Sequence, residues 1–213
     1  MRPQAAATVF GCASVLLSYP DREFTSDLAA VQEALERLPG TSARSKLRAV
    51  VEWLEAMPVV EAAKTYVDVF DLSRGVCLYL TYYRHGDTRE RGMALTALVE
   101  AFREAGFGIV PGELPDYLPA LLELAATSTA GATVLGEHRM ALDALHGALV
   151  NANSPYADAV AAVQSVLPGR SRTDREALRR YRTDGPPSEK VGLEPFAPPE
   201  VLGQGVTMGS TRR

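Results

Sequence analysis

The sequence predicts an all-α fold. Apolar residues recur at three- and four-residue steps through most of residues 1–168, which is the spacing of one helix face. Prolines and glycines, which end helices, separate these apolar runs. Alternating patterns of useful length, which would indicate strands, are absent. We therefore expect one helical domain over residues 1–168.

Five helices are expected before residue 86. Pro20, Pro39-Gly40 and Pro58 separate the first four from one another. The fifth is expected from Ser73 to Arg84, followed by a turn at His85-Gly86-Asp87. The apolar faces expected for the first four are Val9, Ala13, Leu16 and Leu17; Leu28, Val31, Leu35 and Leu38; Leu47, Val50, Val51, Leu54 and Met57; and Val60, Ala63, Val67 and Phe70.

Four more helices are expected in the second half of the domain. The first runs from Arg89 to Ala105, and a Gly/Pro-rich connector follows it. Asp116 is expected to cap the next helix, with Pro119 in the first turn, where no intrahelical donor is lost. A long helix is then expected through Leu135 and Leu149, and Pro155 opens the last one.

The composition changes after Pro168. Residues 169–182 hold six arginines against two carboxylates, which predicts a basic surface segment that could form a short helix. Residues 183–213 contain five glycines and five prolines but few large apolar side chains. Such a stretch buries too little surface to offset the entropy of ordering it, so we expect a flexible tail.

The amino-terminal segment superficially resembles a signal peptide, because no charge interrupts the run from Pro3 to Pro20. Polar and small residues dilute this run, and no small-x-small cleavage motif follows its most apolar part, Val15 to Leu17. We expect a first core helix. No later segment approaches the roughly 18 unbroken apolar residues that a membrane span needs, so no stable membrane insertion is expected.

Charge and cysteine content exclude several classes. The 213 residues carry 22 Lys and Arg against 26 Asp and Glu, a net charge of −4 that argues against a nucleic-acid binder and suits a basic partner. Residues 1–60 hold six basic and seven acidic side chains, so the basic helix-turn-helix of a transcriptional regulator is not indicated. Cys12 and Cys77 form no Cys-x-x-Cys, which excludes a disulfide framework or structural zinc and favours a cytoplasmic protein.

Catalytic machinery is not indicated either. His138 and His146 are expected on one helix, about 12 Å apart along its axis, too far to share a metal. No phosphate-binding glycine motif occurs. A helical enzyme would need a convergent acid, base or metal set, so we expect neither enzyme activity nor a cofactor. An all-helical ligand-binding or regulatory protein is the alternative.

The most unusual segment runs from Asp71 to Arg91. Three of the eight tyrosines, Tyr79, Tyr82 and Tyr83, fall within five positions, and a dense run of charges follows them. Tyrosine and arginine are enriched where an apolar body meets a selective, wet rim. The tyrosines could equally fill the core while the charges solvate a turn, and composition alone leaves both interpretations open.

Two segments together resemble a family. YVDVFDLSRGVCLYLTYYRHGDTRERGMAL (Tyr66 to Leu95) and ELPDYLPALLELAA (Glu113 to Ala126) resemble the NarJ-type assembly chaperones, or delta subunits, of respiratory nitrate reductases, which belong to the TorD-like redox-enzyme chaperones. LLSYPDREF near the amino terminus and PFAPPE (Pro195 to Glu200) are similar to other family segments. Gly75-Val76 and Tyr117 depart from the family pattern, which usually has a basic and a small polar residue at the first site and histidine at the second.

The resemblance implies a cytoplasmic, TorD-like helical bundle that is not part of the finished enzyme. Such chaperones bind the apo catalytic (alpha) subunit of nitrate reductase, chiefly through its amino-terminal segment. They hold it until the molybdenum cofactor is inserted, with cofactor delivery proteins as further possible partners, and they delay its membrane docking. An amphipathic client segment would lie in a groove lined by leucines and tyrosines.

Matching the family motifs residue by residue gives an expected client-binding surface. Its charged members would orient the client, and its tyrosines and leucines would bury the client's apolar side. Replacing Tyr83 and Leu121 with alanine is expected to weaken client binding and leave the fold largely intact. In the alternative, Asp87 pairs with Arg89 or Arg91 inside the protein and fixes the turn. The expected surface comprises Asp71, Tyr79, Tyr83, Arg84, Asp87, Arg89, Arg91, Glu113, Asp116, Tyr117, Leu118 and Leu121.

Overall fold

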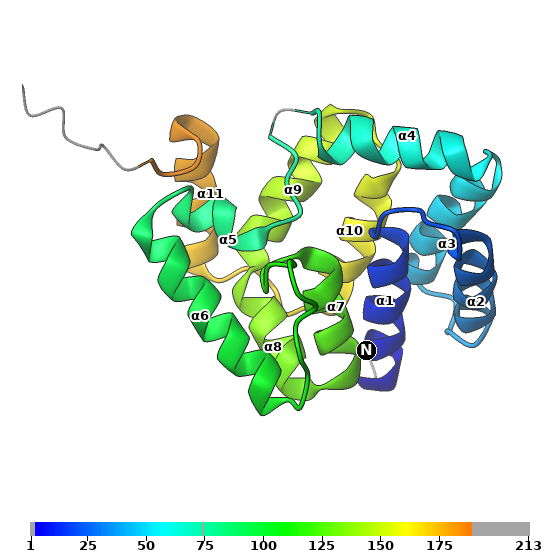
Figure 1. Ribbon diagram of the computed structural model, residues 1–213, viewed down its shortest axis with the longest axis horizontal. Helices are drawn as coiled ribbons and strands as arrows, with labels where there is room; N and C mark the ends of the chain where they lie inside the picture. The colour runs from blue at the N-terminus through cyan, green and yellow to red at the C-terminus, as the bar shows by residue number, and fades with distance from the viewer. Residues whose placement is uncertain (1–2, 74, 189–213) are drawn as a thin grey trace, which may run out of the picture.

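The structure is a computed structural model that describes residues 3–73 and 75–188, and in these residues it contains eleven helices and no strand (Figure 1). The predicted all-α fold is therefore confirmed. One isolated antiparallel bridge joins Tyr79 and Tyr117. The helices are α1 (Pro3–Leu16), α2 (Phe24–Glu36), α3 (Ser42–Glu55), α4 (Val59–Phe70), α5 (Leu80–His85), α6 (Arg89–Glu104), α7 (Leu118–Thr127), α8 (Thr129–Glu137), α9 (Arg139–Asn151), α10 (Tyr156–Val166) and α11 (Arg172–Asp184).

Helix α1 lies in the middle of the molecule. It packs against α7 and α10 and also touches α2 and α3 (Figure 1). Val9, Ala13 and Leu17 have no exposed surface, because neighbouring helices cover this face of α1 and the turn after it. The predicted first core helix is therefore confirmed. Helices α2 and α3 lie on one side of this centre, and α5, α6 and α11 lie on the other (Figure 1).

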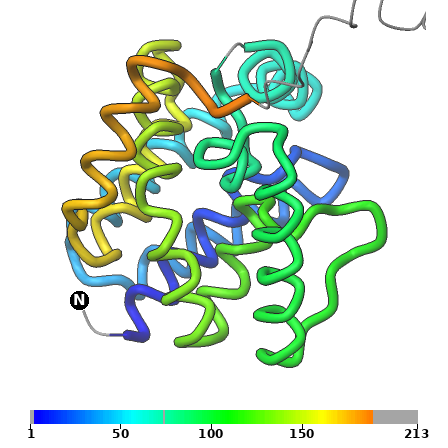
Figure 2. The backbone as a smooth tube through the Cα atoms, turned by 90° about the vertical axis from the view of Figure 1, so that its left-hand side faces the viewer, coloured from blue at the N-terminus to red at the C-terminus, as the bar shows by residue number. Residues whose placement is uncertain are grey.

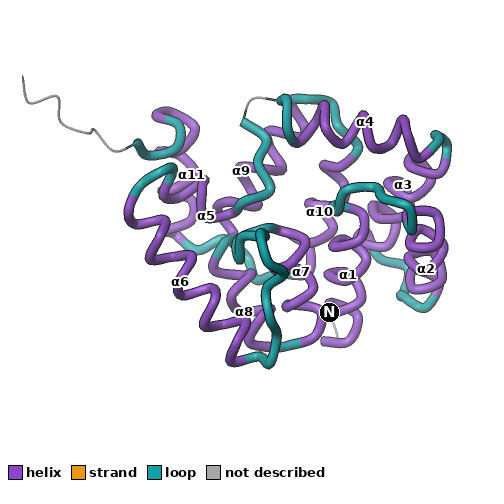
Figure 3. Tube along the Cα trace, viewed as in Figure 1, coloured by secondary structure: helices purple, strands orange, loops and turns teal. Residues whose placement is uncertain are grey.

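The predicted fifth helix is wrong in its first half. Helix α5 begins only at Leu80, and residues 71–73 and 75–79, which lie between α4 and α5, form no helix (Figure 3). Gly75 has a φ of +82°, which an α-helix does not contain. The backbone N–H of Leu80 donates to the carbonyl of Asp116 (3.0 Å), and that of Leu118 donates to the carbonyl of Leu78 (2.8 Å). Pairing with a distant segment thus replaces the helical hydrogen bonds.

The long helix expected through Leu135 and Leu149 is two helices. His138 separates α8 from α9, with a φ of −91° and a ψ of +19° that lie outside the helical range. Its Nδ1 bonds to the carbonyl of Val134 (2.9 Å), and burial lowers the pKa of the imidazole. The prediction that His138 and His146 share one helix is therefore wrong, because His138 lies at the break between α8 and α9.

The basic segment forms α11, which packs on α9 and α5. Ser171 and Asp174 close a capping box at its start, each side chain bonding to the backbone of the other residue. Figure 2 shows α11 along the outside of the other helices. Most of the expected tail, including PFAPPE, lies outside the described residues. None of the described helices is long and apolar enough to cross a bilayer.

Candidate functional site

The two segments that resemble the family meet at one backbone junction. Tyr79 and Tyr117 form the isolated bridge, which ties the start of α5 to the start of α7. Their rings lie 5.6 Å apart, measured between centroids. Residues far apart in the sequence are thus held side by side, and the junction positions the side chains that the sequence singled out.

Asp116 lies fully buried at this junction. Its Oδ2 accepts from the backbone N–H of Thr81 (3.2 Å) and from the Thr81 hydroxyl, and lies 3.5 Å from the guanidinium of Arg91. The prediction that Asp116 caps α7 is therefore wrong. Tyr117 is the N-cap residue of α7, with no side-chain cap bond, and the Asp116 carboxylate holds the first turn of α5 instead.

Arg91 connects this buried carboxylate to the surface. Its Nε donates to the Thr81 hydroxyl (3.2 Å), and its other guanidinium nitrogens pair with Asp116 and with Asp87 (3.2 Å). The structure thus contains the internal ion pair between Asp87 and Arg91 that the sequence left open. Arg89, two residues earlier on α6, is exposed.

Four of the expected client contacts are buried: Tyr83, Asp116, Leu118 and Leu121. This burial contradicts the expectation that they form part of an accessible surface. The hydroxyl of Tyr83 accepts from the backbone N–H of Cys77 (3.0 Å) and donates to the Cys77 carbonyl (3.0 Å). Tyr83 therefore fastens the preceding loop to α5, and the two leucines pack in the core because they lie on the inner face of α7.

A second group of expected residues forms a tyrosine–carboxylate patch: Asp71, Tyr79, Glu113 and Tyr117. The Tyr79 hydroxyl donates to Glu113 (3.4 Å), and the hydroxyl of Tyr117 lies 3.0 Å from that of Tyr66. Burial and the nearby Glu113 carboxylate raise the pKa of Tyr79 to about 12, so the phenol keeps its proton at neutral pH. The hydroxyls of this patch are already engaged with protein groups.

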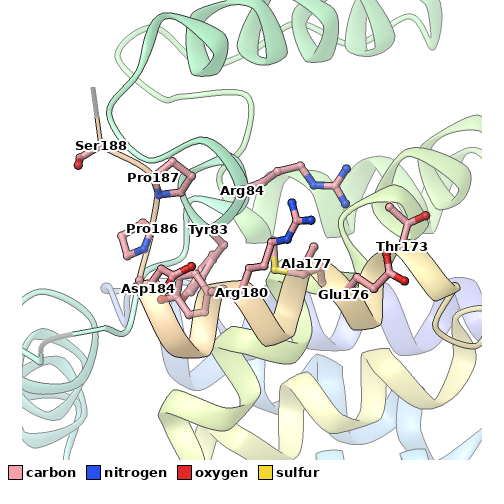
Figure 4. A pocket seen from close by; sticks show the side chains of 13 residues that line it. Tyr83, Arg84, Thr173, Glu176, Ala177, Arg180, Asp184, Pro186, Pro187 and Ser188 are labelled. Atoms are coloured by element: carbon pink, nitrogen blue, oxygen red, sulfur yellow. The ribbon is translucent and has the colours of Figure 1, made fainter. Parts of the chain in front are cut away.

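A recess of about 610 Å³ lies between α5 and α11 (Figure 4). Tyr83 and Met140 form its floor, together with Tyr181, whose ring lies 5.4 Å from that of Tyr83. Helix α11 contributes one face, with residues at steps of three and four: Thr173, Glu176, Ala177, Arg180, Tyr181 and Asp184. We call this space the α11 recess.

Charged side chains form the rim of the α11 recess. Arg84 from α5 and Arg180 from α11 extend over the same space (Figure 4). Arg84 also lies 3.6 Å from Asp174. Glu176 and Asp184 are exposed near the two ends of the α11 face. The recess thus combines an aromatic floor with a rim of both charge signs, which suits recognition of an amphipathic segment.

Comparisons with known proteins give the family. A family model described as the nitrate reductase delta subunit matches residues 28–162, more than half of the chain. The chain belongs to the nitrate reductase delta subunit family. The nitrate reductase-like protein NarX of Mycobacterium tuberculosis is 43% identical over 157 residues, which are 73% of this chain and 24% of NarX.

Two further relatives of this delta subunit chain are named as molybdenum cofactor assembly chaperones of nitrate reductase. The probable chaperone NarJ of Bacillus subtilis is 34% identical over 119 residues, 56% of this chain and 65% of NarJ. NarJ of Escherichia coli K12 is 33% identical over 116 residues, 53% of this chain and 49% of NarJ. The chain therefore spans less than two thirds of the length of each of these relatives.

The delta subunit match explains which part of the site sequence reasoning missed. The matched region contains Tyr83, Arg84 and Met140, whereas every α11 residue of the recess lies beyond it. The motifs therefore pointed to one wall of the α11 recess only. The signal for the other wall was the spacing of Ala177 and Tyr181, four residues apart in an otherwise charged segment.

Within residues 3–73 and 75–188, no group of three or more His, Cys, Asp or Glu side chains is placed to hold a metal ion. Burial raises the pKa of the Cys12 thiol to about 11 and also raises that of Cys77. Both thiols therefore stay protonated at neutral pH, which makes them weak nucleophiles. The α11 recess and the tyrosine–carboxylate patch are surfaces for contact with another molecule.

Gly86 fixes the end of α11 against α5. It has a φ of +55°, and a Cβ added there would lie 1.7 Å from the carbonyl oxygen of Pro187. We expect Gly86→Ala to displace residues 185–188 from α5. The amide of Gly185, which donates to the carbonyl of Tyr181 (2.9 Å), should then exchange its hydrogen faster, as measured by native-state exchange.

Gly75→Ala is the matched control. Gly75 also has a positive φ (+82°), but an added Cβ meets nothing within 4 Å. Both variants place alanine at a positive φ, which side-chain-bearing L-residues rarely adopt, and only Gly86→Ala must also move Pro187. Equal exchange rates for Gly185 in the two variants would show that this close approach does not hold the segment.

Proposed function

We propose that this protein is a cytoplasmic assembly chaperone and not an enzyme. Its client is the apo catalytic subunit of a respiratory nitrate reductase, bound chiefly through the client's amino-terminal segment. The chaperone keeps the client competent for molybdenum-cofactor insertion, with delivery proteins joining at that step, and for later membrane assembly. Membership of the delta subunit family and the names of the NarJ relatives support this proposal.

The observation that carries the proposal is the α11 recess. Its α11 face extends from Thr173 to Asp184, about 16 Å along the helix axis. An amphipathic client helix of about three turns has this length and would place its apolar face on Ala177 and Tyr181, which are half-buried and line the recess. The charges on the rim would fix its orientation, since charge complementarity contributes to register more than to raw affinity.

In this proposal, the residues of the family motifs act mainly by positioning α5 at the recess. Asp116, Thr81 and Arg91 hold α5 against α7, and α5 carries Tyr83 and Arg84 to the recess. We assign client contact to the recess and not to the tyrosine–carboxylate patch, because the hydroxyls of the patch already bond within the protein. The work is recognition of one state of the client over another and requires no bond to be broken.

Isothermal titration calorimetry with a synthetic amino-terminal peptide of the catalytic subunit tests the proposal. Ala177 is half-buried and lines the recess, so Ala177→Phe fills space that the client would occupy. We expect this variant to lose at least tenfold in peptide affinity, about 1.4 kcal/mol. The matched control is Ala30→Phe, the same change at an exposed position of α2, which should bind as the wild type does.

Two results would contradict the proposal at different levels. If the folded wild-type chain binds no client peptide, the chaperone function itself is wrong, and a ligand-binding or regulatory protein becomes the better interpretation. If Ala177→Phe binds the peptide as tightly as Ala30→Phe does, the client lies elsewhere. Circular dichroism of both variants separates a filled recess from a lost fold.

A further inference from the structure

Helix α11 has two different faces. The face described above lines the α11 recess. Another face carries Arg172, Arg175, Arg179 and Arg182, at steps of three, four and three residues that place them in one row along the helix. All four side chains are exposed, and the row extends about 15 Å. We call it the arginine stripe.

Few carboxylates oppose the arginine stripe. Arg172 pairs with Glu176 (3.0 Å). Asp174 is engaged by the capping box and by Arg84. No ion pair is found for Arg175, Arg179 or Arg182 within the part of the chain that the structure describes; Arg175 donates only to the backbone carbonyl of Arg170 (2.8 Å). Most of the positive charge of the stripe therefore faces solvent.

The rest of the domain has the opposite sign. Residues 1–168 contain 13 Lys and Arg against 20 Asp and Glu, whereas residues 169–184 contain six arginines against three carboxylates. The carboxylate of Asp143, on α9, is buried and is shared by Arg139 and by Arg170, which lies just before α11. The protein is thus electrically polarised, with its basic end on a single outer helix (Figure 2).

We propose that the arginine stripe docks the protein reversibly on an anionic lipid bilayer. A plane that touches α11 from outside meets the four guanidinium groups together, while the acidic domain points away from it. Attraction of this kind acts within about a Debye length, roughly 10 Å at 0.1 M salt, and needs no inserted apolar residue. A nucleic acid that followed the protein surface past α11 would instead meet the acid-rich domain.

This inference goes beyond the proposed function. Because the stripe and the α11 recess lie on different faces of one helix, lipid and client can bind together. A client held in the recess would then lie near the bilayer surface, and only the width of α11 would separate the client from the lipid headgroups. The docking is peripheral and would weaken as salt is added.

Vesicle co-sedimentation of the full chain tests the docking. The wild type should bind vesicles made of equal parts phosphatidylglycerol and phosphatidylcholine, and not vesicles of phosphatidylcholine alone. In Arg179→Gln/Arg182→Gln, binding to the anionic vesicles should fall about thirtyfold. Arg22→Gln/Arg37→Gln removes the same charge at exposed positions of the acidic domain and should bind within about twofold of the wild type.

Three outcomes would overturn the proposal. These are equal wild-type binding to the two kinds of vesicle, equal loss in the two double variants, and tighter binding to duplex DNA than to anionic vesicles at the same phosphate concentration. Calorimetry with the client peptide keeps this test separate from that of the proposed function. Neither Arg179 nor Arg182 lines the α11 recess, so Arg179→Gln/Arg182→Gln should bind the peptide normally.

Discussion

Asp116→Ala is expected to destabilise the protein by about 3–5 kcal/mol, because it leaves a charge without its buried partner. Asp116 is fully buried, and the variant removes the acceptor of the Thr81 N–H and one partner of Arg91, whose side chain is itself mostly buried. Urea denaturation monitored by circular dichroism measures the loss in unfolding free energy. Thermal unfolding should show a parallel decrease of about 2–4 °C for each kcal/mol.

Asp87→Ala is the control that isolates burial. Asp87 pairs with the same Arg91, at 3.2 Å, but its side chain is 81% exposed. Exposed pairs contribute at most about 1 kcal/mol, so this variant should remain close to the wild type. If the two alanine variants lost similar amounts of stability, the Asp116 carboxylate would not be the group that holds α5 against α7.

Leu121→Ala is expected to cost about 2–5 kcal/mol, the range for truncating a buried leucine. Leu121 has no exposed surface and lies on the inner face of α7, the helix that packs against α1 and α8. The burial of Leu121 and Tyr83 also means that their joint replacement by alanine should damage the fold. Lower peptide binding in that double variant would therefore not identify a contact with the client.

Leu72→Ala makes the same chemical change at a side chain that is 70% exposed. It should alter the free energy of unfolding by no more than about 0.5 kcal/mol. Urea denaturation of the two single variants, measured side by side, gives the comparison. A stability loss for Leu72→Ala that matched the loss for Leu121→Ala would show that the loop before α5 is packed more tightly than its exposure indicates.

Periodicity located most helices because burial of one face dominates their energetics. It failed between α4 and α5, where Val76, Leu78 and Leu80 are buried at alternate positions. This is the spacing of a strand, but five residues are too few to distinguish it from part of a helix. What fixes the extended backbone is the bridge to Tyr117, a long-range contact that no local pattern contains.

The expected face of α4 shows a different limit. The sequence favoured Val60, Ala63, Val67 and Phe70, yet the structure buries Ala62, Tyr66 and Phe70 and leaves Val60 exposed. Valine ranks as more apolar than tyrosine, so periodicity favoured the wrong face. Tyr66 is buried because its hydroxyl donates to the carbonyl of Leu17 (3.2 Å) and its ring packs against Phe70, with 4.6 Å between the ring centroids.

The candidate site was half predictable. Motif residues identified α5 and the junction, and the structure places Tyr83 and Arg84 at the α11 recess. The sequence could not show that α11 returns to cover them, because its contribution is a helix face of mixed polarity with only Leu178 buried. Nor could the sequence distinguish residues that would touch the client from residues that hold the fold, because a motif does not show whether an aspartate is buried or exposed.

The bridge between Tyr79 and Tyr117 also limits how this fold can be recombined with its relatives. The loop before α5 and the turn before α7 complete one another's hydrogen bonds, so each supplies what the other lacks. A chimera that exchanged only one of these two segments would pair it with a segment from a different protein, and the backbone hydrogen bonds between them could be lost. Hybrid chaperones built to swap clients should therefore transfer residues 75–91 and 113–118 as a unit.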